Sequence, residues 1–372
     1  MTPAGEARAR RDVRLLVVDP STGTLADRHP DDLVELLAPG DVLVVNDAAT
    51  LPASLRGTGA DGSPLELRLA GVSARGFWAV LFGAGDWRQR TEDRPPPPVV
   101  PVGTRIPLDG GLVAAVVRRS PLSARLIEIT FDRAGASLYA ALYGAGRPVQ
   151  YAYQRAPLAL WSVQTAYGAR PLAFEMPSAG RPLTWAVLLG LQARGVSVAR
   201  LTHAAGLSAT GDPALDAALP LPERYEIPPE TVACIDAART SGRRVVAVGT
   251  TVVRALEGAV AGRARLVAGA GTTDLRLGPG FVPRIVTDLL TGMHVPGESH
   301  YALLQAFVDA RLLGRVTSHA DAAGYLSHEF GDLTLVLRSG APARRYDAGS
   351  SARRRWRKRR TAGSLSSPIA RS

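Results

Sequence analysis

Two segments of the chain hold residue types whose spacing suits chemistry on a small molecule. In the first, an apolar β-branched run at residues 245–248 leads into Gly249, Thr250 and Thr251 and then into an apolar helical pattern. This order predicts a strand, a tight turn and a helix, and we expect the two threonines to cap the helix. Backbone N–H groups at the start of a helix lack partners within it, so they can hold an anionic part of a ligand.

The second segment follows about thirty residues later and places a lone histidine, His294, with Pro296 in a loop rich in glycine and proline. An imidazole titrates close to neutral pH and suits proton transfer, although a structural role for this loop histidine is equally open. Arg254 lies one turn into the helix of the first segment. Its guanidinium can pair with an anion of the ligand or with Glu257, three residues further on.

The cysteine and lysine counts exclude several classes of site. Cys234 is the only cysteine, so an intrachain disulfide and a cysteine-rich zinc or iron–sulfur site are excluded. Its apolar helical surroundings predict a buried position. Lys358 is the only lysine and belongs to a basic C-terminal run, so the rest of the chain has no lysine for a phosphate loop, a Schiff base or a pyridoxal site.

The net charge of +11 comes mostly from the C-terminal segment. Residues 343–372 hold ten basic residues and one acidic residue, which leaves 34 basic and 32 acidic residues elsewhere. We expect residues 341–372 to be a disordered basic tail. This tail either touches RNA phosphates, with Trp356 stacked on a base, or is a solvated extension.

Targeting and membrane signals are not visible in the sequence. The first twelve residues are polar, and no apolar stretch approaches the roughly 20 residues of a membrane span. We therefore expect a cytoplasmic protein with no membrane partner.

The order of strand-like and helix-like segments predicts an α/β main domain with an inserted all-β, small barrel-like domain. Short β-type runs separated by turn residues fill the region from residue 55 to residue 148. These runs lie at 65–69, 77–82, 111–117 and 125–131, and the four prolines at 95–98 require a loop or an edge. We assign residues 13–54 plus 149–340 to the main domain and 55–148 to the inserted domain.

Helical and strand-like segments alternate in the main domain. Expected helices lie at 183–194, 228–241 and 300–313, and expected strands at 41–47, 196–201, 244–248 and 333–337. The glycine-rich run 269–273 is interpreted as a hairpin turn. Asn46 and Asp47 end one strand, where ligand contacts and local turn capping are both open.

Several ordered motifs give the chain a family resemblance over most of residues 13–338. The motif segments are 39–47, 51–56, 164–167, 177–180, 246–257, 294–296 and 331–332. With these motifs the chain resembles the S-adenosylmethionine:tRNA ribosyltransferase-isomerases of queuosine biosynthesis, as a divergent member. Arg181, Pro182 and Leu183 stand where the family usually has Leu-His-Phe, His203 is displaced by one place, and Leu221 and Pro222 replace the usual histidine pair before Glu223.

The resemblance implies a reaction. The ribosyl part of S-adenosylmethionine, a co-substrate, moves onto 7-aminomethyl-7-deazaguanine in the anticodon region of tRNA and gives epoxyqueuosine, while adenine and methionine leave. Such chemistry needs a base beside the sulfonium, a proton donor for adenine and contacts for the methionine carboxylate, and it demands no metal. The altered motifs leave two alternatives open: a transferase that uses S-adenosylmethionine on a non-tRNA acceptor, or an inactive RNA-binding homologue. A monomer is favoured.

The motif positions and residue types together nominate a site. The candidate catalytic residues are His294, Glu223 and His203. The candidate substrate-binding residues are Asp47, Gln164, Thr165, Ser178, Gly249, Thr250, Thr251, Arg254 and Pro296. Trp161, Tyr167 and Trp185 can stack on a base, although we favour core packing for all three.

Overall fold

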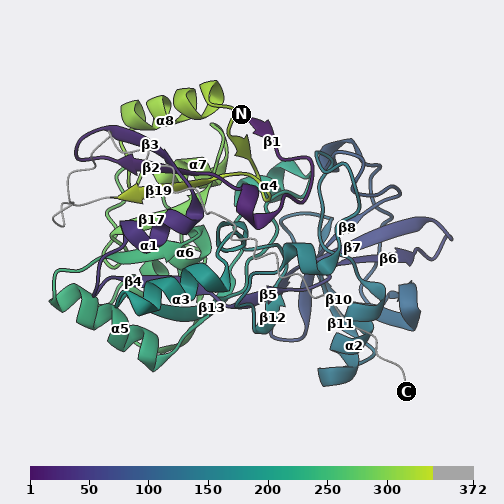
Figure 1. The fold of residues 1–372 in the computed structure, drawn as a ribbon. Coiled ribbons are helices and arrows are strands. Elements are labelled where there is room, and N and C mark those ends of the chain that lie inside the picture. Colours follow the sequence, from purple (N-terminus) through teal and green to yellow (C-terminus); the bar gives the residue numbers. More distant parts are fainter. Residues whose placement is uncertain (338–372) are drawn as a thin grey trace, which may run out of the picture. The chain divides into compact units, whose positions relative to one another are not determined.

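A nine-stranded mixed sheet forms the α/β part of the protein. The computed structural model describes residues 1–337, so the segment expected to be a disordered basic tail lies outside the described residues. The strands follow the order β16 (Gly269–Thr273), β14 (Glu223–Ile227), β13 (Ser197–His203), β4 (Val42–Asn46), β15 (Val245–Val248), β17 (Asp288–Gly292), β19 (Leu333–Leu337), β2 (Leu15–Asp19) and β3 (Thr24–Arg28). Figure 1 shows part of this order, with β3, β2, β19 and β17 following one another down the view.

The four central strands of the sheet pair in parallel, and the pairs outside them are antiparallel except for the parallel pair β19 with β2. Strand β4 pairs in parallel with β13 and β15, and β15 pairs in parallel with β17. Strands buried on both faces form continuous apolar runs, as at residues 42–45 and Val245–Val248. Because carboxyl ends of parallel strands meet at one edge, loops after β4, β13, β15 and β17 are brought together there.

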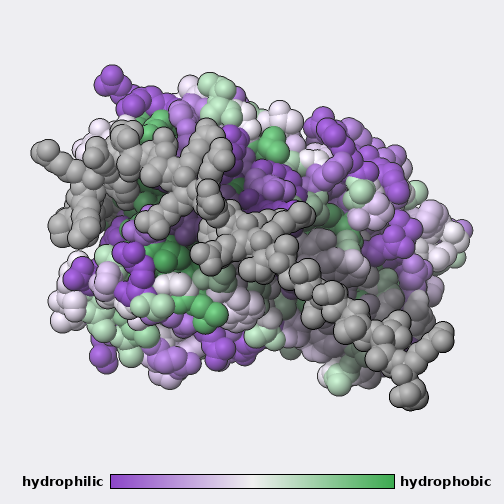
Figure 2. Space-filling model, in the orientation of Figure 1, coloured by the Kyte–Doolittle hydropathy of each residue, from purple (hydrophilic) through white to green (hydrophobic). Residues whose placement is uncertain are grey.

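Helices cover both faces of this sheet. Alternate side chains of β4 point to opposite faces, so Val42 and Val44 join one core cluster while Leu43 and Val45 join another. The first cluster contains residues of α5 (Pro229–Thr240), α6 (Thr250–Val260) and α8 (Ala310–Ala322), and the second contains residues of α1 (Leu33–Leu36) and α3 (Trp185–Ala193). Polar residues cover much of the face shown in Figure 2, with hydrophobic residues scattered among them.

A closed six-stranded antiparallel barrel forms the all-β part. Its strands are β6 (Ser54–Thr58), β7 (Pro64–Val72), β8 (Phe77–Phe82), β9 (Arg105–Leu108), β10 (Leu112–Arg119) and β11 (Leu126–Phe131). A bridge between Gly57 and Leu108 closes the barrel. The predicted fold class is confirmed, and residues 95–98 form a loop as expected. The domain limits at residues 54–55 and 148–149 stay a prediction.

Short elements complete the described chain. They are the strand pairs β5 (Ala48–Thr50) with β12 (Arg170–Ala173) and β1 (Thr2–Pro3) with β18 (Leu326–Ser327), the helices α2 (Gly135–Ala145), α4 (Pro213–Ala218) and α7 (Ser299–Leu304), and the 3-10 turns η1 (Arg10–Asp12), η2 (Pro30–Asp32), η3 (Thr91–Asp93), η4 (Asp109–Gly111), η5 (Leu160–Val163) and η6 (Ser178–Gly180). No helix within residues 1–337 is long and apolar enough to cross a membrane.

Three sequence predictions about these elements are wrong. The run 269–273 is edge strand β16, which pairs with β14, and it does not form a hairpin turn. The expected helix 300–313 is two helices, α7 and α8, because Asp309 caps a new helix by accepting a hydrogen bond from Leu312 N at 2.8 Å. Cys234 is only half-buried, although it packs against the core of the sheet.

Candidate active site

A cavity of about 460 Å³ opens where the loops after β13, β15 and β17 meet the start of β14. Residues 175–179 and 328–329 also line it, together with Tyr151, Tyr153, Asp216, Leu219 and Pro220. Seven of the predicted site residues line it: Ser178, Glu223, Gly249, Thr250, Thr251, Arg254 and His294. These residues come from segments far apart in sequence, and a cavity with converging polar groups is the usual form of a small-molecule site.

The β15–α6 junction presents the start of a helix to this cavity. Gly249 is the N-cap, with φ of +88°, a backbone conformation that favours glycine. The prediction that the two threonines cap the helix is wrong, because Thr250 and Thr251 are its first two residues and no side chain caps it. The first backbone N–H groups of a helix have no intrahelical partner, so the cavity wall at residues 249–251 suits an anionic group.

A buried ion pair joins β14 to α6 beside this junction. Arg254 Nη2 donates to Glu223 Oε2, and Gly206 N donates to Glu223 Oε1 at 2.7 Å. Burial raises the pKa of Glu223 and lowers the pKa of Arg254, in each case against the attraction of the partner. The loss of hydration therefore outweighs the mutual attraction in both groups.

The alternative prediction that Arg254 pairs with Glu257 on its own helix is wrong. Glu257 accepts hydrogen bonds from the backbone N–H groups of Arg284, Ile285 and Val286 at 2.8–2.9 Å. Glu257 therefore anchors the segment before β17, and the Arg254 guanidinium is directed to Glu223.

His203 lies behind the ion pair and does not line the cavity. It is fully buried at the end of β13, with Nε2 3.2 Å from Glu223 Oε2. Burial, together with the nearby Arg254 guanidinium, lowers the pKa of His203 to about 3, so the imidazole is neutral at neutral pH. Both ring nitrogens of His203 are buried without a hydrogen-bond partner among the described residues.

Two stacked imidazoles, one from the loop after β17 and one from the start of α7, line the cavity. The rings of His294 and His300 are 5.1 Å apart, and Thr291 Oγ1 lies 2.8 Å from His294 Nε2. Burial and the neighbouring His300 lower the pKa of His294 well below its ordinary value. Burial and Arg254 lower the pKa of His300 to about 4, so both rings are neutral at pH 7.

The cavity lining also holds carboxyl groups that sequence analysis did not nominate. Tyr151 OH donates to Glu175, and Tyr153 OH donates to Glu329 Oε2. The ring of Tyr153 stacks on His328, with centroids 4.6 Å apart. Glu175 lies two residues before Pro177, the start of the 177–180 motif, and this closeness was the one available signal in the sequence.

Acidic groups dominate the charge of the cavity lining. Five carboxylic acid side chains face one guanidinium, that of Arg254; they are Glu175, Asp216, Glu223, Glu298 and Glu329. A surplus of carboxylates suits a cationic part of a ligand, whereas the α6 terminus suits an anionic part. In residues 1–337, no group of three or more His, Cys, Asp or Glu side chains is arranged to hold a metal ion.

Four other predicted substrate-binding residues lie outside the cavity lining. Asp47 accepts a hydrogen bond from Thr202 Oγ1 at 2.6 Å and lines a separate cleft with Arg170. Gln164 accepts from Thr50 N at 2.9 Å and donates to Thr50 O at 2.8 Å. Thr165 is buried, and Pro296 is exposed on the loop before α7.

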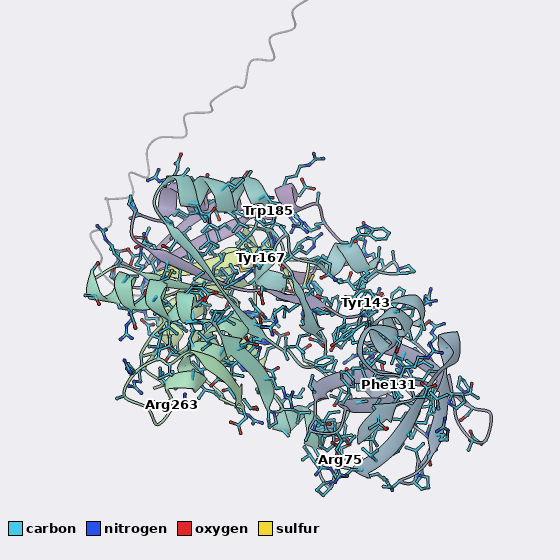
Figure 3. The ribbon with its side chains drawn as sticks, turned by 90° about the horizontal axis from the view of Figure 1, so that it is seen from below. Arg75, Phe131, Tyr143, Tyr167, Trp185 and Arg263 are labelled. Atoms are coloured by element: carbon cyan, nitrogen blue, oxygen red, sulfur yellow. The ribbon has the colours of Figure 1, made fainter. Side chains whose placement is uncertain are left out.

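The aromatic residues considered for base stacking differ in exposure. The prediction of core packing is wrong for Trp161 and Trp185, whose exposed fractions are 79% and 58%. Figure 3 shows Trp185 on the surface of α3 and Tyr167 beneath it. Tyr167 packs against the core on the α3 face of the sheet, as expected.

Comparisons with known proteins agree on one family. A family model described as queuosine biosynthesis protein matches residues 2–336. A protein of Anaeromyxobacter sp. (strain Fw109-5), named S-adenosylmethionine:tRNA ribosyltransferase-isomerase, is 36% identical over 343 residues, covering 90% of this chain and 95% of its own. A protein of Acidiphilium cryptum (strain JF-5) with the same name is 34% identical over 346 residues, with coverage of 90% and 95%.

A solved structure is also similar to the chain. It is the crystal structure of an S-adenosylmethionine tRNA ribosyltransferase from Thermotoga maritima, 24% identical, with a TM-score of 0.48 and coverage of 91% of this chain and 95% of that one.

Proposed function

Because the chain belongs to the family of queuosine biosynthesis proteins, we propose that it is an S-adenosylmethionine:tRNA ribosyltransferase-isomerase. The observation that carries the proposal is the assembly of motif residues around one cavity. Ser178, the Gly249–Thr251 turn, the Glu223–Arg254 pair and His294 all line it. Its substrates are S-adenosylmethionine and a tRNA that carries 7-aminomethyl-7-deazaguanine, and its product is epoxyqueuosine in that tRNA.

Charge distribution supports a binding mode for S-adenosylmethionine. The methionine carboxylate lies at the free N–H groups of α6, where the helix dipole favours an anion. The sulfonium lies near the carboxylates of Glu298 and Glu329, which line the same cavity. Opposite charges attract more strongly in a protein-enclosed cavity than in water, so this arrangement orients the nucleoside between the two walls.

The remaining site residues receive roles from their geometry. His294 is a neutral imidazole with Thr291 Oγ1 at 2.8 Å from Nε2. In the tautomer whose Nε2–H donates to Thr291 Oγ1, the Nδ1 atom is free to accept the proton beside the sulfonium. Glu223, fixed by Arg254 and Gly206 N, binds a ribose hydroxyl, and the neutral ring of His203 packs behind it, with Nε2 3.2 Å from Glu223 Oε2. No metal ion takes part in these steps.

The setting of the reaction belongs to the same proposal. The protein acts as a monomer in the cytoplasm, where its tRNA substrate is made.

Incubation with both substrates tests this function. The protein, S-adenosylmethionine and tRNA carrying 7-aminomethyl-7-deazaguanine are combined, released adenine and methionine are measured by chromatography, and tRNA nucleosides are identified by mass spectrometry. We expect adenine, methionine and epoxyqueuosine in equal amounts, and none with tRNA that carries guanine at that position. Failure to release adenine, while a family relative converts the same tRNA in parallel, would refute the proposal.

Two variants connect that activity to the cavity. Thr251→Val and His294→Ala lower turnover without unfolding the chain, because both positions line the cavity and neither belongs to the fully buried core. Thr272→Val is the matched control, since Thr272 is exposed on β16. Adenine release without tRNA would point instead to a small-molecule acceptor, and tRNA binding without S-adenosylmethionine binding would point to an inactive RNA-binding homologue.

A further inference from the structure

Glu175 lines the cavity just after β12. Its carboxyl group accepts hydrogen bonds from Tyr151 OH and, at 3.0 Å, from Ser208 N. Ser208 Oγ in turn lies 3.3 Å from Tyr151 OH. The group is therefore held in one orientation by neutral donors while it remains open to the cavity.

The surroundings of Glu175 favour a bound proton. The charged groups that face it are Glu329, which repels a second negative charge, and Arg68, whose guanidinium lies 5.6 Å from the ring centre of Tyr151. Arg68 is committed to Glu66, with its Nε 2.7 Å from Glu66 Oε1. Burial and then the Glu329 charge raise the pKa of Glu175 to about 7, against the lowering effect of the Tyr151 and Ser208 hydrogen bonds.

Five other titratable groups in the lining suit this task less well. Glu223 is paired with a guanidinium, whereas Glu175 has neutral donors only. His294 and His300 have lowered pKa values and carry no proton to donate at pH 7. The phenols of Tyr151 and Tyr153 have raised pKa values and already donate to carboxylates. Two carboxyl groups in different surroundings are a common arrangement for dividing acid and base roles.

We propose that Glu175 is the acid that protonates the departing adenine, with Tyr151 as its positioning residue. The inference rests on the proposed function. A bond forms between the acceptor amine nitrogen and the ribosyl carbon, and the bond from that carbon to adenine breaks. Adenine leaves with the bonding electron pair and takes the Glu175 proton. The amine's surplus proton then passes to the Glu175 carboxylate and restores the acid.

Variants of Glu175, Tyr151 and Glu329 test the assignment through the rate of adenine release in single turnovers. Glu175→Gln keeps an acceptor for Tyr151 but carries no transferable proton, so we expect a loss of about 100-fold or more. S-adenosylmethionine should still bind with wild-type affinity by calorimetry, which shows that the variant is folded. Glu230→Gln, at an exposed position of α5, is the matched control and should keep the wild-type rate.

The pH profile gives a readout that a merely structural role would not move. Because the protonated form acts, the wild-type rate falls as pH rises through the Glu175 pKa of about 7. Tyr151→Phe removes a hydrogen bond that lowers this pKa, so the fall moves to higher pH. Glu329→Gln removes a repulsion that raises it, so the fall moves to lower pH.

The outcomes separate the two claims. Opposite shifts of the profile, together with the loss in Glu175→Gln, support the assignment. A wild-type enzyme that is active while Glu175→Gln keeps its rate and profile overturns the role of Glu175 alone. A wild type that releases no adenine from the correct tRNA overturns the proposed function and this inference together.

Discussion

Burying the Glu223–Arg254 pair is predicted to lower the free energy of unfolding, and removing only one of the two partners is predicted to lower it further. Both side chains are buried, with exposed fractions of 6% and 7%, and both pKa values are shifted towards the neutral forms. Removing one partner leaves the other charge buried and unpaired. We therefore expect Arg254→Met and Glu223→Gln each to lower the free energy of unfolding by about 3–5 kcal/mol.

The double variant Glu223→Gln with Arg254→Met removes both charges at once. The new amide keeps an oxygen for Gly206 N, and its NH₂ group faces His203 Nε2, which lies 3.2 Å from Glu223 Oε2 and has no hydrogen bond among the described residues. Methionine fills most of the volume of the arginine stem. We expect the double variant to equal the wild type or to exceed its stability by about 1–4 kcal/mol.

Urea titration of the four proteins, followed by tryptophan fluorescence, measures the cycle. Adenine release should be lost in all three variants, because the pair lines the cavity. Additive losses in the free energy of unfolding, with the double variant less stable than either single variant, would refute this reasoning. They would show that the attraction between the two charges exceeds the free energy lost when both are buried.

Three further predictions concern stability. Gly249→Ala should lose about 1–2 kcal/mol in urea titration through its φ of +88° alone, because an added Cβ meets nothing closer than 3.5 Å; an unchanged midpoint would contradict this. Gly258→Ala should lose about 1–3 kcal/mol despite better helix propensity, since its Cβ would lie 2.8 Å from Thr273 Cβ; a stabilised variant would show that α6 and β16 can separate freely. The pKa values of His203 and His300 are lowered to about 3 and 4, so below pH 6.5 the unfolded chain binds more protons than the folded protein. The free energy of unfolding therefore falls as pH falls below 6.5. His300→Gln should reduce the slope of the free energy of unfolding against pH between pH 4 and 7, and an unchanged slope would contradict this.

Local sequence patterns predicted the parts of the site that are local. The β15–α6 junction follows from an apolar run that meets Gly249, because both the strand and the turn are encoded within a few residues. The barrel strands β7, β8, β10 and β11 follow from short β-type runs between turn residues for the same reason. The prediction that the threonines cap α6 is wrong because Gly249 itself is the N-cap. Backbone geometry decides the start of a helix to within one residue, and the sequence pattern does not.

Long-range packing created the part of the site that was missed. Tyr151, Glu175 and Glu329 come from three segments, and only the folding of these segments around one cavity brings them together. Strand β16 was missed because glycine-rich segments have weak strand propensity, and it is the pairing with β14 that makes the segment a strand. The exposure of Trp161 also depends on tertiary contacts, which residue type alone does not determine.

A crystal structure of the protein with S-adenosylmethionine tests the central claim most directly. The account predicts the methionine carboxylate at the backbone N–H groups of Thr250 and Thr251, with the sulfonium nucleoside between His294 and the wall that holds Glu175. Density for the ligand in the cleft of Asp47 and Arg170, with the cavity at the β15–α6 junction empty, would contradict it.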